Sequence, residues 1–222
     1  MSGIECLKKH DVDFNVLSVV TSKNARSIKS IYRFFIDEGL MNHQFIPCLD
    51  PLEACSSNRC TGTALSAPLY TRFLKDLFDV WFEDRMAGVP VYNRYFENLA
   101  GILMGYLPES CNMRGRCAIQ YAIEANGNVY PCDFYMMDNC LLGNINHDDI
   151  HALDLRRFKM GFVERSCALP TQCYACKWFS LCHAGCYRER AVRDVLQPPL
   201  HRYCEAYKEF FPYAIPRLGA LL

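Results

Sequence analysis

The sequence has no net charge, no long apolar run and no apolar segment near its first residue. The 24 Lys and Arg residues balance 24 Asp and Glu residues, so no surplus charge draws the chain to a nucleic acid or an anionic membrane. No segment reaches the roughly 18 uninterrupted apolar residues of a membrane-spanning helix, and the first ten residues do not form the apolar core of a secretory signal. These absences predict a cytoplasmic protein with no nucleic-acid or membrane partner.

Cysteine, by contrast, is abundant, with 14 residues in a chain of 222. A reducing cytoplasm keeps such thiols from forming stable disulfides, and a chain of this length can fold without them. Metal ligation is therefore the leading explanation, and the missing signal argues against a secreted disulfide-rich protein. Ten of the cysteines fall between Cys111 and Cys204, which predicts a domain boundary near residue 108.

The first half alternates strand and helix patterns. Residues 12–20 form the apolar, β-branched run of a buried parallel strand, and 24–38 keep apolar residues at helical spacing before Gly39. A second strand at 44–46 and an amphipathic helix at about 69–86 follow. This order predicts an α/β layer or part of a barrel, whose functional loops follow the strand ends. Because two or three strands cannot close a barrel, we interpret this half as part of something larger.

The second half opens with a hairpin pattern. Residues 117–124 and 129–133 match its two arms, which are joined at Asn126-Gly127, a dipeptide typical of tight turns. A short helix is expected near 148–158, and the rest of the chain is predicted to be cysteine-rich loop and turn.

Spacing divides the cysteines of the second half into two groups. They are Cys173-x2-Cys176-x5-Cys182-x3-Cys186 followed by Cys204, and Cys111-x5-Cys117-x14-Cys132. Four thiolates hold a tetrahedral zinc or a cuboidal iron–sulfur cluster. The group of three lacks a fourth ligand, and the group of five has one cysteine more than a site needs. The eight cysteines therefore predict two metal sites with four ligands each. The spacing does not identify the metal. The alternative to two iron–sulfur sites is one structural zinc site with several thiols that bind no metal.

Three segments of the second half resemble the SPASM domain of radical-SAM enzymes. They are Gly-Asn-Val-Tyr-Pro-Cys-Asp-Phe-Tyr at 127–135, Leu-Gly-Asn-Ile at 142–145, and Cys-Tyr-Ala-Cys-Lys-Trp-Phe-Ser-Leu-Cys-His-Ala-Gly-Cys at 173–186. Within that superfamily the chain is most similar to the anaerobic sulfatase-maturating enzymes, and the resemblance includes 44–52 and 203–217. The implied fold is α/β: the C-terminal part of a partial (β/α) radical-SAM barrel at 1–107, then a SPASM domain at 108–222 with a β-hairpin and two iron–sulfur sites.

The resemblance also implies the roles of individual residues. One auxiliary [4Fe–4S] cluster is held by the positions matching Cys111, Cys117, Cys132 and Cys186, and the second by those matching Cys173, Cys176, Cys182 and Cys204. The catalytic proton acceptor matches Asp133, and a contact to S-adenosylmethionine matches Leu49. Proton loss beside a cluster is reasonable chemistry for an oxidation, because the electron left behind has a nearby acceptor. From the residues alone, the alternatives are an Asp that caps a turn and an ordinary core or loop leucine.

Several further residues have no predicted role in the clusters. The unassigned thiols are Cys6, Cys48, Cys55, Cys60, Cys140 and Cys167, and a single cysteine of this kind is usually a small buried hydrophobe. His183 lies between two ligand positions, but four sulfurs per site are already available. We therefore expect it beside the site or at the surface.

One motif of the family is missing, namely the Cys-x3-Cys-x2-Cys that holds the radical-generating cluster. S-adenosylmethionine and a third [4Fe–4S] cluster are therefore expected only in the complete enzyme, and this chain alone should not cleave S-adenosylmethionine. We interpret it as a truncated or split form of an oxidoreductase that converts a Cys or Ser of a sulfatase to Cα-formylglycine.

The implied partners are a sulfatase polypeptide substrate, a reductant such as flavodoxin or ferredoxin, and a missing N-terminal radical-SAM half. Two alternatives to this function remain. One is another SPASM peptide-modifying enzyme, and the other is a stand-alone electron-transfer or zinc-stabilised module.

Overall fold

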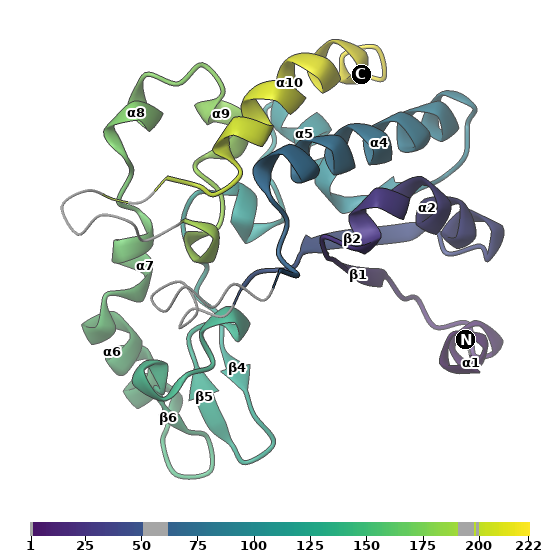
Figure 1. The fold of residues 1–222 in the computed structure, drawn as a ribbon. Coiled ribbons are helices and arrows are strands. Elements are labelled where there is room, and N and C mark those ends of the chain that lie inside the picture. Colours follow the sequence, from purple (N-terminus) through teal and green to yellow (C-terminus); the bar gives the residue numbers. More distant parts are fainter. Residues whose placement is uncertain (1, 51–61, 191–197, 199) are drawn as a thin grey trace. The chain divides into compact units, whose positions relative to one another are not determined.

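The computed structural model describes residues 2–50, 62–190, 198 and 200–222, and the chain forms two compact units. The first unit comprises Met1–Ser110 with Tyr203–Leu222, and the second comprises Cys111–Arg202. Their secondary structure is mixed α and β (Figure 1). Among the described residues, none of the helices has the length and apolar character needed to cross a membrane.

The first unit contains a parallel sheet of three strands. They are β1 (Val16–Val20), β2 (Asn42–Pro47) and β3 (Tyr92–Asn93), in the spatial order β1-β2-β3. Val16 lies opposite His43 and Val20 opposite Pro47 in the β1–β2 ladder. The predicted strand–helix–strand–helix order is confirmed, although the first strand is shorter than the predicted 12–20.

Among the described residues, the first unit contains the helices α1 (Ser2–Lys9), η1 (Asn24–Ser27), α2 (Ile28–Asp37), α4 (Ala67–Met86), α5 (Arg94–Leu103) and α10 (Cys204–Leu218). Helix α4 begins where Ser66 Oγ accepts a hydrogen bond from the Leu69 N–H at 3.4 Å. Pro68 fits in its first turn because no intrahelical hydrogen bond is required there. Helix α10 lies along α4 (Figure 1).

The prediction of loop and turn after residue 158 is wrong for α10. Pro212 and Pro216 lie inside this helix, and an interior proline disfavours a helix by about 3 kcal/mol. Tertiary packing overrides the propensity, because Phe210, Phe211 and Ala214 are completely buried. This packing also places 203–222 in the first unit, whereas the predicted division put these residues with the second domain.

The core of the first unit is aromatic. Phe78 of α4 is completely buried, and its ring centroid lies 5.2 Å from that of Phe96 and 5.9 Å from that of Phe210. Nearer the start of the same helix, Tyr70 stacks on Tyr203 with 4.0 Å between ring centroids. Helices α4, α5 and α10 therefore share one core.

Replacing Phe78 by alanine is expected to lower the free energy of unfolding by about 3–5 kcal/mol, because the surrounding rings cannot fill the cavity. Phe34→Ala is the matched control, since Phe34 belongs to the same unit and is 47% exposed. Its expected loss is below about 1 kcal/mol. Urea unfolding followed by circular dichroism measures both, and equal losses would contradict the central position of Phe78.

The second unit contains a small antiparallel sheet, β4 (Ala122–Ile123), β5 (Asn128–Tyr130) and β6 (Gly143–Asn144). The predicted hairpin is confirmed, and Gly127 occupies its turn with φ +87°. Glycine is favoured here because a residue with a Cβ rarely adopts this left-handed φ. Helix α6 (Ile150–Met160) begins at Asp149, whose carboxylate accepts from the Ala152 N–H at 2.8 Å.

The described part of the second unit also contains several short helical turns. They are η2 (Cys111–Met113), η3 (Asp133–Tyr135), η4 (Asp138–Cys140), α7 (Phe162–Ser166), α8 (Thr171–Tyr174), α9 (Phe179–Cys182) and η5 (Tyr187–Glu189). Its small apolar core is formed by Val129, Leu142 and Leu153, from the sheet, the segment before β6 and α6. Most of the cysteines of this unit lie on these turns or directly beside them.

Candidate metal centre

Seven of the eight predicted ligands belong to the second unit, and they include one complete predicted set, Cys111, Cys117, Cys132 and Cys186. Three of them stand at the start of 3-10 turns: Cys111 begins η2, Cys132 precedes η3 and Cys186 precedes η5. Such positions fix the backbone around each sulfur without burying it inside a regular helix.

Three of these thiols act on one another electrostatically. Burial is the main cause of the raised pKa of Cys117, and the charge of ionised Cys111 adds to it. Burial also raises the pKa of Cys186, followed by the Glu189 carboxylate and then by the charges of Cys117 and Cys111. Because salt screens charges over about 10 Å, mutual effects of this kind indicate that these three thiols share one region of the unit.

Cys132 and Asp133 are in direct contact. The Cys132 thiol donates a hydrogen bond to Asp133 Oδ1 at 3.1 Å. Burial raises the pKa of Cys132 to about 12, the backbone N–H of Phe134 lowers it, and the Asp133 carboxylate raises it further. Asp133 is exposed and caps no helix N–H in the part of the chain that the structure describes. The Asp133 carboxylate therefore accepts a hydrogen bond from a thiol and does not cap a turn.

The other predicted ligands follow in sequence. Cys173 is buried on α8, and the N–H of Cys176 donates to the Cys173 carbonyl at 3.2 Å, so one turn carries both thiols. Cys182 is the last residue of α9. Cys204 is the first residue of α10, in the first unit.

A left-handed segment separates Cys182 from Cys186. Its residues His183, Ala184 and Gly185 have φ values of +45°, +64° and +64°. Each non-glycine residue in this conformation costs about 1–2 kcal/mol, so surrounding contacts must hold the segment in place. A Cβ on Gly185 would lie 2.2 Å from His201 Cδ2, which explains the glycine there.

The donor set suits an iron–sulfur cluster, although its sulfurs do not yet converge. Among the described residues, no three His, Cys, Asp or Glu side chains form a ready-made metal site. Four thiols of one unit are nonetheless the ligands that such a cluster takes. The N–H of Arg188 donates to Cys186 Sγ at 3.4 Å, and that of Phe134 is hydrogen-bonded to Cys132. Such bonds stabilise thiolates, and metal binding would draw the sulfurs together.

The remaining residues that the sequence singled out differ in their burial. Leu49 is half-buried just beyond the end of β2, and the preceding residue, Cys48, still donates its N–H to the Val20 carbonyl at 2.7 Å. His183 is half-buried, and its Nδ1 has no hydrogen-bond partner in the described part of the chain. Of the unassigned thiols, Cys6 and Cys167 are exposed, and Cys48 and Cys140 are half-buried. Cys55, Cys60 and the end of the 44–52 segment lie outside the described residues.

Two residues that the sequence did not single out connect the cysteine segments. Ser166 is completely buried, and its Oγ accepts a hydrogen bond from the Cys117 N–H at 2.8 Å. Its carbonyl accepts one from Arg190 Nη1 at 2.6 Å. No spacing rule points to either residue, because both bind backbone groups that are distant in sequence.

A comparison with protein families agrees with this description of the second unit. Residues 111–177 match the SPASM family, an iron–sulfur cluster-binding domain. The match begins at the first residue of the second unit. The predicted resemblance to this domain is confirmed.

Known proteins resemble nearly the whole chain. It is 42% identical over 214 residues to the cysteine-type anaerobic sulfatase-maturating enzyme of Clostridium perfringens (strain 13 / Type A), covering 96% of this chain and 57% of the relative. The serine-type enzyme of Bacteroides thetaiotaomicron is 27% identical over 231 residues, covering 97% of this chain and 55% of the relative. The chain therefore spans little more than half the length of these curated relatives.

A solved structure shows the same similarity in three dimensions. Native anSMEcpe with bound AdoMet and Kp18Cys peptide matches with a TM-score of 0.89 and 41% sequence identity, over 99% of this chain and 60% of that chain. The predicted similarity to anaerobic sulfatase-maturating enzymes is confirmed.

Proposed function

We propose that this chain is the auxiliary-cluster and substrate-handling part of an anaerobic sulfatase-maturating enzyme of the radical-SAM type. The observation that carries the proposal is 42% identity over 96% of this chain to a relative of which it spans only 57%. The complete reaction is the oxidation of a Cys or Ser side chain of a sulfatase to Cα-formylglycine. The reaction belongs in the cytoplasm, with a flavodoxin or ferredoxin as reductant.

On this proposal, residues 1–107 are the C-terminal part of a partial (β/α) barrel, and 108–222 are the SPASM domain. The exposed side of β1 supports the assignment of residues 1–107 to a partial barrel. Among the described residues β1 pairs only with β2, and its Leu17 and Val19 are 60% and 56% exposed. Parallel strands are normally covered on both faces and at their edges. An N-terminal radical-SAM half would provide that cover.

The second unit would hold the auxiliary [4Fe–4S] cluster of Cys111, Cys117, Cys132 and Cys186. Its four thiols belong to one unit, and two of the sulfurs receive backbone hydrogen bonds. The second set, Cys173, Cys176, Cys182 and Cys204, is proposed on the family resemblance alone. When bound, these clusters would supply acceptors for the electron released by substrate oxidation.

Asp133 is the proposed proton acceptor, and its contact with Cys132 supports this role. The carboxylate now accepts a hydrogen bond from that thiol at 3.1 Å. A thiol must lose its proton before it binds a metal, so ligation removes this donor from Oδ1. The exposed carboxylate is then available to a substrate proton. Leu49, just beyond β2, would contact S-adenosylmethionine in the complete enzyme, which also carries the third cluster.

Iron and sulfide analysis of the anaerobically reconstituted chain tests the proposal. We expect about eight iron and eight sulfide per chain, with the broad visible absorption of [4Fe–4S] clusters. Ultraviolet–visible and EPR spectra taken on the same samples identify the cluster type. Stoichiometric zinc without charge-transfer absorption would contradict the proposal and favour a zinc-stabilised module instead.

A further inference from the structure

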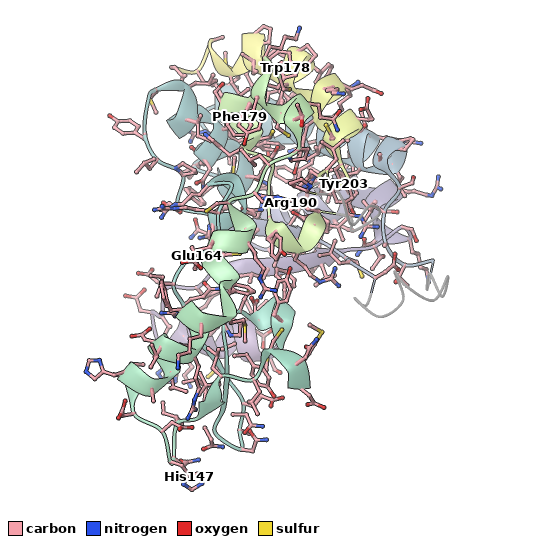
Figure 2. All side chains as sticks on the ribbon, turned by 90° about the vertical axis from the view of Figure 1, so that its left-hand side faces the viewer. His147, Glu164, Trp178, Phe179, Arg190 and Tyr203 are labelled. Carbon is pink, nitrogen blue, oxygen red and sulfur yellow. The ribbon has the colours of Figure 1, made fainter. Side chains whose placement is uncertain are left out.

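The guanidinium group of Arg190 is buried in the second unit and is bonded through all five of its N–H groups. Its Nε donates to the Ala184 carbonyl at 3.1 Å. Nη1 donates to the carbonyls of Ser166 at 2.6 Å and Ala168 at 3.1 Å. Nη2 donates to those of Gly115 at 2.8 Å and Gly185 at 3.1 Å. Only 3% of the residue is exposed, and Figure 2 labels it on the ribbon of the second unit.

These carbonyls belong to segments that carry predicted ligands. Gly115 lies two residues before Cys117, while Ala184 and Gly185 immediately precede Cys186. One side chain therefore ties both ligand segments together. It also holds two residues of the left-handed segment, whose conformation needs such support.

The positive charge of Arg190 has no carboxylate partner in the part of the chain that the structure describes. The neighbouring Glu189 carboxylate instead lies 3.2 Å from His201 Nε2. Burial lowers the pKa of Arg190, whereas the charges of ionised Cys117, Cys186 and Cys173 raise it. A buried charge is stable when opposite charge lies nearby, and thiolates would provide it here.

We propose that Arg190 is a positioning residue of this site and the fixed positive counter-charge of the cluster bound by Cys111, Cys117, Cys132 and Cys186. The inference rests on the proposed cluster function. Four thiolates outweigh the positive charge of the iron–sulfide core, so the loaded site is anionic. A fixed positive charge favours the reduced, more negative state, and Arg190 therefore raises the reduction potential of this cluster.

Two variants of the whole chain, Arg190→Gln and Arg190→Lys, distinguish the effect of the positive charge at this position from the effect of its hydrogen bonds. The glutamine variant keeps a donor but loses the charge, and its cluster should be harder to reduce by about tenfold in the equilibrium constant, equivalent to 59 mV for one electron. The lysine variant should stay close to the parent chain. Arg156→Gln is the control, because Arg156 is 47% exposed in its side chain and pairs with Asp148 at 2.7 Å. Spectroelectrochemical titration measures each potential.

An unchanged potential in Arg190→Gln would overturn the proposal. If that variant fails to load iron, recovery of loading in Arg190→Lys supports the proposal, because the positive charge is restored without the fork of the guanidinium. Equal loss of iron in both variants overturns the counter-charge role. Absence of iron and sulfide from the reconstituted parent chain is a different result, since it rejects the cluster function itself.

Discussion

Asp133→Asn, introduced into a protein extended to the full length of the relatives, is expected to lower formylglycine formation by about 10²–10⁴-fold. This is the range that a positioned general base contributes, and an amide cannot accept the proton. Asparagine keeps the size of the side chain, so the backbone of η3 and the neighbouring Cys132 should remain in place. Mass spectrometry of a cysteine-containing sulfatase peptide measures the product.

Asp138→Asn is the matched control for this experiment, because Asp138 is an exposed carboxylate at the start of the next 3-10 turn. Its activity should equal that of the parent enzyme. Iron content must also be unchanged in Asp133→Asn, since the substitution removes a contact of a ligand thiol. If Asp133→Asn keeps full activity and full iron content, Asp133 is not the proton acceptor and serves only as a local hydrogen-bonding residue.

Cys186→Ser is expected to remove about half of the iron and sulfide, from about eight of each to about four. The serine hydroxyl is a poor substitute for a thiolate, so the cluster of Cys111, Cys117 and Cys132 would lose its fourth ligand. Colorimetric iron and sulfide analysis of the anaerobically reconstituted variant measures the loss. Cys140→Ser is the control, since Cys140 is a half-buried thiol of the same unit with no predicted cluster role.

Double variants then test which cysteines share a cluster. If Cys111 and Cys186 bind the same cluster, Cys111→Ser with Cys186→Ser should lose no more iron than either single variant. Cys182→Ser with Cys186→Ser should lose nearly all of it, because one ligand of each cluster is removed. The opposite pattern would mean that Cys186 completes the local group of 173, 176 and 182.

Sequence patterns predicted the regular parts of this fold because those parts follow local rules. The β-branched run before Val20 and the Asn126-Gly127 turn each specify their structure within a few residues. Helix α10 was missed because Pro212 and Pro216 signal a break, and its stability comes from aromatic packing against α4. No local pattern reports such long-range packing.

The candidate site was only partly predictable for a related reason. Cysteine spacing predicted two groups of thiols, but the ligand pairing came from the family resemblance. The left-handed conformation of 183–185 is not visible in the residue types, because His183 and Ala184 rarely adopt it. Arg190 was missed because its five acceptors are backbone carbonyls, which every residue carries.

The position of α10 has a consequence for the order of events during synthesis. All of Cys111–Arg202 leaves the ribosome before residues 203–222, whose Phe210 and Phe211 complete the core of the first unit. Domains generally fold as units while the chain is elongated. The first unit therefore cannot complete its core until the whole second unit has been synthesised, whereas the second unit is built from one continuous stretch of chain.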